Sequence, residues 1–319
     1  MRIVYFGSGG FAVPSLRWLV NSRHEVVKVV TEPARDSDDE KTRLTSPVAL
    51  QSSEEGLSVL FCEDVNAPAF VEQIKACKAH LGIVAAFGQE LSPSMRSAFD
   101  GGCVSIHGSL LPKYRGPDAV SWAILNGEDK TGVTVFRITD QFYAGPILSQ
   151  RETVIKPMET SEELAYRLAR VACDAIDGAL KPLEDNLQFA GEAQDDSLAI
   201  EAPQLKESDG YLRFDEAAES IALRCRAMWP WPGGRCLYYS ASGRSEEVVI
   251  ITATTVETTE NTAPGTVNSD YTIATAKGAL KIHELEVSGN RWVKWEGFLK
   301  GRNVKPGDCF QPIQHPTSP

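Results

Sequence analysis

Short apolar runs alternate with segments of helical spacing along the first part of the chain. The runs expected to form strands are Arg2–Phe6, Val26–Thr31, Leu57–Phe61, Leu81–Phe87, Val104–His107 and Gly132–Ile138. Strands separated by helices of about ten residues or more indicate βαβ units and a mostly parallel sheet. The pattern therefore predicts a Rossmann-like α/β domain over residues 1–190, with helices on both faces of its sheet. In such sheets ligands bind beyond the carboxyl ends of the strands.

The pattern changes in the last third of the chain. A helix is expected over Thr160–Leu180 with Ser161 as its N-cap, and the polar stretch 191–207 is expected to be a linker. Residues 208–310 then carry short β-branched runs divided by turns, which predicts a small OB-like β-barrel. We expect the tail, residues 311–319, to be disordered. The barrel strands are expected at Leu237–Tyr239, Glu247–Thr255, Gly265–Val267, Tyr271–Ala274 and Leu280–Val287.

Composition narrows the class of protein. The chain is 42% hydrophobic and 24% charged, as in ordinary globular proteins, and its formal net charge of −11 argues against general nucleic-acid binding. The seven cysteines are scattered and none forms a C-x-x-C pair, so we expect reduced thiols and no metal site. No apolar run approaches the length of a membrane span. These features predict a cytoplasmic protein that does not enter membranes.

A glycine-rich turn follows the first expected strand. Residues 7–12, Gly-Ser-Gly-Gly-Phe-Ala, fit the pattern G-x-G-x-x-[GA], and Glu32 follows the second strand where a ribose-binding acid would lie. This pattern is typical of NAD-binding oxidoreductases. Glycines are also what any tight strand-to-helix turn requires, so the match alone is weak evidence.

A second motif places a histidine at the end of another expected strand. Residues 105–116 read Ser-Ile-His-Gly-Ser-Leu-Leu-Pro-Lys-Tyr-Arg-Gly. His107 thus lies where ligands bind in a parallel sheet, just before a loop punctuated by Pro112 and Gly116. A histidine titrates near neutral pH and is suited to proton transfer. The plainer alternative is a buried, hydrogen-bonded histidine.

This segment resembles the signature of the folate-dependent formyltransferases, Asn-x-His-x-Ser-Leu-Leu-Pro-x-x-Arg-Gly. Three more blocks resemble that family: the opening at residues 7–16, the Ala-Pro-Gln-Leu segment at 202–210 and the Pro-Trp-Pro-Gly turn at 230–233. The resemblance covers essentially the whole chain and points to the methionyl-tRNA formyltransferases. It implies transfer of a formyl group from 10-formyltetrahydrofolate to the amino group of initiator methionyl-tRNA in translation initiation.

The resemblance also assigns the catalytic positions. His107 matches the histidine that moves protons, and Ser105 stands where the family has an asparagine that stabilises the oxyanion. Tyr143 falls on the position of the family aspartate, with Asp140 near it in sequence. A serine is a shorter donor, and a tyrosine carries no charge at neutral pH, so we expect impaired activity. Asp140 is about 10 Å away along an extended segment and would replace the carboxylate only in a rebuilt loop.

Two segments are expected to bind the folate. The first is the loop that follows His107, and the second resembles the family's Tyr-Gly-Gln. Their residues are Ser109, Leu110, Leu111, Pro112, Phe87, Gly88 and Gln89.

The partner implied by the resemblance is the acceptor stem of methionyl-tRNA, bound by a monomer. In the family a basic loop meets the tRNA, but here the loop over residues 33–43 has four acids against three bases. Such a loop repels phosphate. The bases expected to contact tRNA are Arg35, Lys41, Arg43, Arg291, Lys294, Lys300 and Arg302.

Three alternatives stay open at this point. The chain is a non-catalytic folate- or tRNA-binding relative, or an N-formyltransferase that acts on an amino sugar, or an NAD-binding oxidoreductase. The amino-sugar enzymes resemble the family in their catalytic residues but in general lack this kind of C-terminal barrel.

Overall fold

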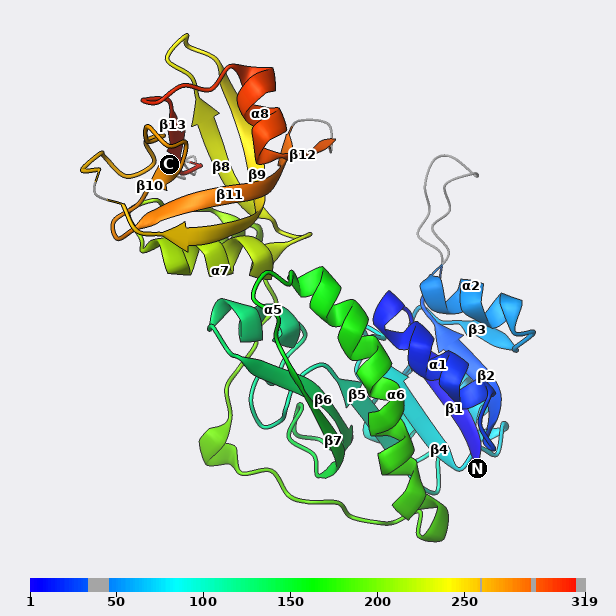
Figure 1. Cartoon of the computed structure of the whole chain (residues 1–319). Coiled ribbons are helices and arrows are strands. Elements are labelled where there is room, and N and C mark those ends of the chain that lie inside the picture. The colour runs from blue at the N-terminus through cyan, green and yellow to red at the C-terminus, as the bar shows by residue number, and fades with distance from the viewer. Residues whose placement is uncertain (34–45, 259, 288–290, 314–319) are drawn as a thin grey trace, which may run out of the picture. The chain divides into compact units, whose positions relative to one another are not determined.

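The computed structural model describes residues 1–33, 46–258, 260–287 and 291–313 (Figure 1). The chain divides into two compact units: Met1–Ala119, Lys130–Val154 and Ala165–Ala202 form the first, and Val120–Asp129, Ile155–Leu164 and Pro203–Pro319 form the second. Residues 191–202, where the sequence predicts a linker, are therefore part of the first unit. Among the described residues, no helix is both long enough and apolar enough to cross a bilayer.

A seven-stranded sheet forms the centre of the first unit. The strands are β1 (Arg2–Gly7), β2 (Glu25–Thr31), β3 (Val59–Phe61), β4 (Leu81–Ala85), β5 (Cys103–His107), β6 (Lys130–Arg137) and β7 (Ile147–Val154). They lie in the order β3-β2-β1-β4-β5-β6-β7. The pairs from β3 to β5 are parallel, whereas β6 is antiparallel to both β5 and β7. The mostly parallel sheet is confirmed, and β7 was not among the expected strands because it is largely polar.

Helices cover both faces of this sheet. Successive side chains of a strand point to opposite faces, and β1 illustrates the result. Val4 and Phe6 belong to a buried cluster with side chains of α3 and α4. Tyr5 points the other way, and its hydroxyl lies 2.7 Å from Ser15 Oγ of α1. The helices of this unit are α1 (Val13–Val20), α2 (Pro47–Glu54), α3 (Pro68–Lys75), α4 (Pro93–Arg96) and most of α6 (Ser161–Asp185).

The N-cap of the long helix α6 lies one residue before Ser161, the N-cap that the sequence predicts. The Thr160 hydroxyl accepts a hydrogen bond from the Glu163 N–H (3.3 Å), and the Glu163 carboxylate accepts one from the Thr160 N–H (2.9 Å). This reciprocal arrangement is a capping box, so Thr160 is the N-cap. Ser161 instead donates its hydroxyl proton to the Trp229 carbonyl.

The second unit is a nearly closed antiparallel barrel. Its strands are β8 (Gly234–Tyr239), β9 (Ser245–Val256), β10 (Ile273–Ala274), β11 (Ala279–Val287), β12 (Arg291–Lys294) and β13 (Cys309–Gln311). They pair in the order β10-β11-β9-β8-β13, and β12 pairs with β11. Isolated bridges from Thr266 to Cys309 and from Val267 to Ile273 link β13 to β10. Gln311, placed in the tail by the sequence pattern, therefore ends a barrel strand.

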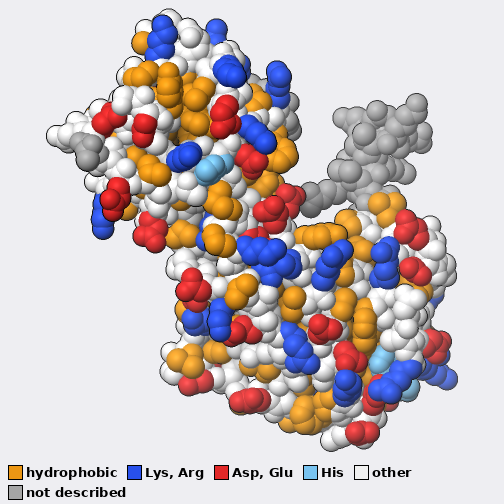
Figure 2. Space-filling view, viewed as in Figure 1, with side chains coloured by type: hydrophobic (Ala, Val, Ile, Leu, Met, Phe, Trp, Pro, Cys, Tyr) orange, Lys and Arg blue, Asp and Glu red, His pale blue; other side chains and the backbone are white. Residues whose placement is uncertain are grey.

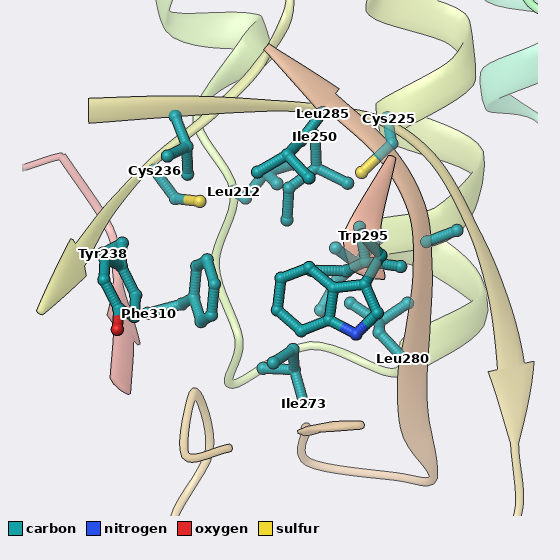
Figure 3. Close-up of a cluster of buried hydrophobic side chains, with 14 of the residues drawn as sticks. Leu212, Cys225, Cys236, Tyr238, Ile250, Ile273, Leu280, Leu285, Trp295 and Phe310 are labelled. Carbon is teal, nitrogen blue, oxygen red and sulfur yellow. The ribbon is translucent and has the colours of Figure 1, made fainter. Parts of the chain in front are cut away.

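Aromatic side chains fill the barrel. Tyr238 and Phe310 point toward each other with ring centroids 5.3 Å apart, and Trp295 lies 6.1 Å from Phe310 (Figure 3). All three are buried. Large aromatic rings contribute much apolar area in a small domain. The helices of this unit are α5 (Ala119–Leu125), α7 (Ala218–Met228) and α8 (Trp295–Arg302).

Candidate active site

His107 is the last residue of β5, at the carboxyl edge of the parallel strands. Ser105 precedes it by two residues and therefore lies on the same face of the sheet, about 7 Å along the strand. On the neighbouring strand β6, Thr134 is opposite His107 and Phe136 is opposite Ser105. The fold thus brings both predicted residues to one face and one edge of the sheet.

A single hydrogen bond fixes the form of the His107 imidazole. Its Nε2 lies 2.8 Å from the Tyr114 carbonyl oxygen. A carbonyl only accepts, so Nε2 carries the proton. In the neutral ring the lone pair is then on Nδ1, which is the atom able to take a proton from a reacting group.

Aromatic rings enclose this imidazole. The Tyr143 ring lies 4.8 Å from the His107 ring at an interplanar angle of 49°, and the Phe136 ring meets it edge-on at 6.4 Å. His107 is only 7% exposed. Burial lowers the pKa of His107 to about 4, against a smaller opposing effect of the Tyr114 hydrogen bond. The imidazole is therefore neutral at physiological pH.

The Tyr143 side chain contacts His107 through its ring and is uncharged at neutral pH. Burial, and then the nearby Asp118 carboxylate, raise the pKa of its hydroxyl. Its backbone is in the left-handed region (φ 53°), and the Phe142 ring packs edge-on against it at 4.7 Å. At neutral pH this residue is an uncharged cover over His107.

Asp140 is turned away from the histidine. Its side chain is 82% exposed and forms an ion pair with the Arg96 guanidinium. The effects that set the His107 pKa are burial, which lowers it, and the Tyr114 hydrogen bond, which raises it, and Asp140 is not among them. Asp140 and His107 are thus not brought together.

Ser105 is half-buried. Within the described ranges its hydroxyl has no hydrogen-bond partner, and so the proton is available to an oxygen atom that enters the site. A serine hydroxyl donates one hydrogen bond from a short side chain.

The loop after His107 is held by two polar residues, one on β6 and one on β7. Thr134 Oγ1 donates to the Ser109 carbonyl (2.6 Å) and accepts from the Leu111 N–H (3.0 Å). Gln150, opposite Thr134 on β7, donates to the Leu111 carbonyl at 2.8 Å. The Ser109 hydroxyl closes the turn on the Lys113 carbonyl (2.7 Å). Residues 109–112 therefore form a loop fixed against β6 and β7.

The end of the motif joins this loop to the segment before the barrel. The buried Arg115 guanidinium donates to Gln194 Oε1 at 2.8 and 3.1 Å, and its backbone N–H donates to the Ile200 carbonyl at 2.8 Å. Gln194 in turn donates to the carbonyls of Tyr143 (2.8 Å) and Gly145 (2.7 Å). Arg115 thus supports, through Gln194, the turn that places the Tyr143 ring. Only these long-range contacts identify Gln194, for which the local sequence gives no signal.

The second predicted folate segment is mostly structural. The Phe87 side chain is 2% exposed and packs edge-on against Phe6 at 5.6 Å. The Gln89 amide oxygen accepts from the Val65 N–H at 2.9 Å. Gly88 is exposed, and a methyl group on it would lie 2.6 Å from Glu32 Oε1. Of the three residues, Gly88 is the one whose position is open to a ligand.

The structure describes four of the seven basic residues predicted to bind tRNA, all on β12 and α8. Arg35, Lys41 and Arg43 lie outside the described residues. Figure 2 shows Lys and Arg side chains interspersed with acids on the visible surface of both units. Arg302 forms an ion pair with Glu246, whereas three others are exposed at β12 and α8: Arg291, Lys294 and Lys300. Within the described residues, no group of three or more His, Cys, Asp or Glu could hold a metal ion.

Comparison with known proteins assigns the chain to a family. Residues 1–180 match the family described as formyl transferase, and residues 204–303 match the formyl transferase C-terminal domain. The methionyl-tRNA formyltransferase of Geobacter metallireducens is 32% identical over 311 residues, covering 96% of this chain and 97% of that protein. The methionyl-tRNA formyltransferase of Solibacter usitatus is 33% identical over 306 residues, covering 95% of this chain and 96% of that protein.

The chain belongs to the methionyl-tRNA formyltransferase family. It is thus a formyltransferase-family enzyme by descent, as the motifs around His107 predict, and the oxidoreductase alternative is not favoured. Membership also accounts for the barrel, because the C-terminal family model spans most of it.

Solved structures share the fold of this formyltransferase-family chain. The N-formyltransferase of Helicobacter canadensis, in complex with folinic acid and dTDP-3-aminofucose, has a TM-score of 0.64 at 15% identity, covering 87% of this chain and 97% of that one. HypX of Aquifex aeolicus, in complex with tetrahydrofolic acid, has a TM-score of 0.60 at 18% identity, and the match covers 96% of this chain and 48% of HypX. At these identities the likeness concerns the fold alone.

Proposed function

We propose that this chain transfers a formyl group from 10-formyltetrahydrofolate to the amino group of methionyl-tRNA, with His107 as the proton-transfer group. The similarity to methionyl-tRNA formyltransferases over nearly the full length of both chains supports the substrates. The observation that carries the proposal is the neutral, enclosed His107 imidazole beside the intact loop 109–112. The amino-sugar alternative has only a likeness of fold in its favour.

His107 suits the proton work of this reaction. When bound, 10-formyltetrahydrofolate supplies the formyl group, and its nitrogen leaves with a proton. Because Nε2 is held by the Tyr114 carbonyl, Nδ1 accepts the proton that the attacking amine loses. Because burial disfavours the charged ring, the resulting imidazolium readily gives that proton to the leaving nitrogen. A neutral, buried base thus serves as both proton acceptor and proton donor.

Two positions of this site differ from the family signature. Ser105 takes the place of the asparagine and offers one hydroxyl to the developing oxyanion. Tyr143 takes the place of the aspartate and covers the imidazole with an uncharged ring. The loss of a well-placed oxyanion donor costs roughly 10²–10³-fold in rate. We therefore propose an active site that works more slowly than its asparagine- and aspartate-bearing relatives.

We propose that the loop 109–112 lines one side of the bound folate. The half-buried Leu110 and Pro112 offer apolar surface to a flat ring. The Ser109 and Thr134 hydroxyls already bond the loop backbone, so they hold its shape and leave ligand recognition to other groups. We further propose that the chain acts as a monomer and that no metal takes part.

Single-turnover formylation of methionyl-tRNA by excess protein tests the function. We expect the wild-type chain to form formyl-methionyl-tRNA, and the double variant Ser105→Asn, Tyr143→Asp to form it faster by roughly 10²-fold or more. Acid-gel separation of the charged tRNA measures both rates. Formylation by the double variant alone would make the natural chain a non-catalytic relative, and formylation by neither would exclude methionyl-tRNA as the acceptor.

The titration of His107 tests the enclosed, uncharged environment. NMR titration of the imidazole Cε1 proton, assigned by its loss in His107→Gln, is expected to give a pKa of about 4. Because this lies below the ordinary value of about 6.5, the unfolded chain binds the extra proton. The titration of His107 therefore leaves the free energy of unfolding unchanged above about pH 6.5 and lowers it as the pH falls from 6.5 toward 4. In Tyr143→Asp the new carboxylate should raise the pKa; an unchanged pKa in that variant would contradict the contact.

A further inference from the structure

A groove of about 420 Å³ lies between α1 and α6 of the first unit, helices that can be followed in Figure 1. Val13, Pro14 and Trp18 line it from α1, and Tyr166 and Arg170 line it from α6. None of these residues belongs to the site around His107 or to the sheet core. The groove is therefore a separate surface feature, with aromatic rings on both of its walls.

The α6 wall presents an exposed ring together with a cation. The Tyr166 side chain is 65% exposed, and the Arg170 guanidinium lies over its ring at 5.1 Å from the centroid. Arg170 Nη2 also donates to the Tyr166 hydroxyl at 3.3 Å. Among the described residues, no carboxylate pairs with Arg170. The guanidinium therefore orients the ring and keeps its own charge for an incoming anion.

The α1 wall carries one ring and one cation, those of Trp18 and Arg17. Trp18 is half-buried, and the neighbouring Arg17 reaches Gln51 Oε1. The carboxylates of Glu54 and Glu55 lie 3.9 Å from Arg17, at the limit of an ion pair. Exposed ion pairs of this kind are weak. Two aromatic rings and two guanidinium groups thus line one groove.

The groove begins at the edge of the sheet that carries His107. Gly10, which lines it, belongs to the turn after β1, and this turn is tied to the end of β4 by bonds from the Ser8 and Gly9 N–H groups to the Ala86 carbonyl, both 3.0 Å. Strands β1, β4 and β5 are adjacent and parallel, so their carboxyl ends share an edge. A flexible chain lying in the groove would point one end toward that edge.

This combination matches single-stranded nucleic acid better than other partners. Proteins bind unpaired nucleotides by stacking bases on aromatic rings and placing arginines at the backbone phosphates. We propose that the groove binds one or two unpaired nucleotides near the aminoacylated end of the acceptor RNA. A base stacks on Tyr166 opposite Trp18, and Arg17 and Arg170 contact phosphate. The inference rests on the proposed function, because that function supplies an RNA whose reactive end is single-stranded.

Binding of uncharged tRNA to the full chain tests the groove independently of turnover. We expect Tyr166→Ala to raise the Kd by about tenfold, because a base stack on an aromatic ring contributes on this scale. Tyr166→Phe keeps the ring and should bind like the wild type. Phe189→Ala is the matched control, since Phe189 is an exposed aromatic of the same unit outside the groove. Fluorescence titration at fixed salt measures all four proteins.

A tRNA that lacks its unpaired 3′ nucleotides completes the test. Wild type and Tyr166→Ala should bind this shortened RNA equally, because the stacked base is gone. A tenfold difference in Kd that persists with the shortened RNA would overturn the inference. It would also be overturned if the wild type and Tyr166→Ala bound the intact tRNA equally well, or if neither bound it. Formylation by the wild type is measured separately. Normal tRNA binding without formylation would count against the proposed function and leave the groove standing.

Discussion

His107→Gln is expected to lower the single-turnover rate of formyl transfer by about 10²–10⁴-fold, the usual contribution of a general acid–base group. Glutamine places an amide N–H close to the position of Nε2, so it can still donate to the Tyr114 carbonyl. It has no basic nitrogen where Nδ1 lies. The substitution therefore removes the proton acceptor while it preserves the hydrogen bond that holds the loop.

Two companion variants separate chemistry from structure. His107→Ala also deprives the Tyr114 carbonyl of its partner and should be less stable than His107→Gln by about 1 kcal/mol. Tyr143→Phe keeps the ring over the imidazole and should react within a few-fold of wild type, because the Tyr143 hydroxyl is uncharged at neutral pH. A His107→Gln protein that retains the wild-type rate would remove His107 from the mechanism.

Gly116→Ala is expected to lower the free energy of unfolding by about 3 kcal/mol or more. A methyl group at Gly116 would lie 2.0 Å from the Ala202 carbonyl oxygen, and the backbone φ of +143° is one that side chains rarely adopt. Such strain and overpacking each cost about 1–3 kcal/mol. The two segments cannot separate easily, because backbone hydrogen bonds of 2.8 and 2.7 Å join Arg115 to Ile200 and Ala202.

The same substitution should also reduce the formylation rate. The displaced segment carries Gln194, which holds the Tyr143 carbonyl. Gly297→Ala is the control, because no atom lies within 4 Å of its added methyl group and helical alanine is favourable. Urea unfolding followed by circular dichroism measures the stabilities. Equal midpoints for Gly116→Ala and Gly297→Ala would mean that residues 200–202 are not held against the motif.

The sequence predicted the parts of the site that follow from local pattern. The apolar run ending at His107 indicates a buried strand, and its place among helices indicates a parallel sheet. Together these place the histidine at the edge where ligands bind. The barrel follows in the same way from short β-branched runs, because alternation along a strand reports which side chains are buried.

Other parts of the site depend on pairing between distant segments. Thr134 and Gln150 fix the loop only because β5, β6 and β7 pair in one register. The polar residues of β7 gave no strand signal, since a strand at the edge of a sheet is half exposed. Local patterns carry burial and periodicity but not the register of pairing.

By itself, then, the sequence determined the fold class, the position of His107 and the family's loop. Each of these follows from the pattern of residues that are neighbours in the sequence. The tertiary structure alone decided the chemistry around the histidine. It placed the Tyr143 ring on the imidazole, turned Asp140 to Arg96 and put Nε2 on the Tyr114 carbonyl. Burial and hydrogen-bond partners set a pKa, and both come from residues that only folding brings together.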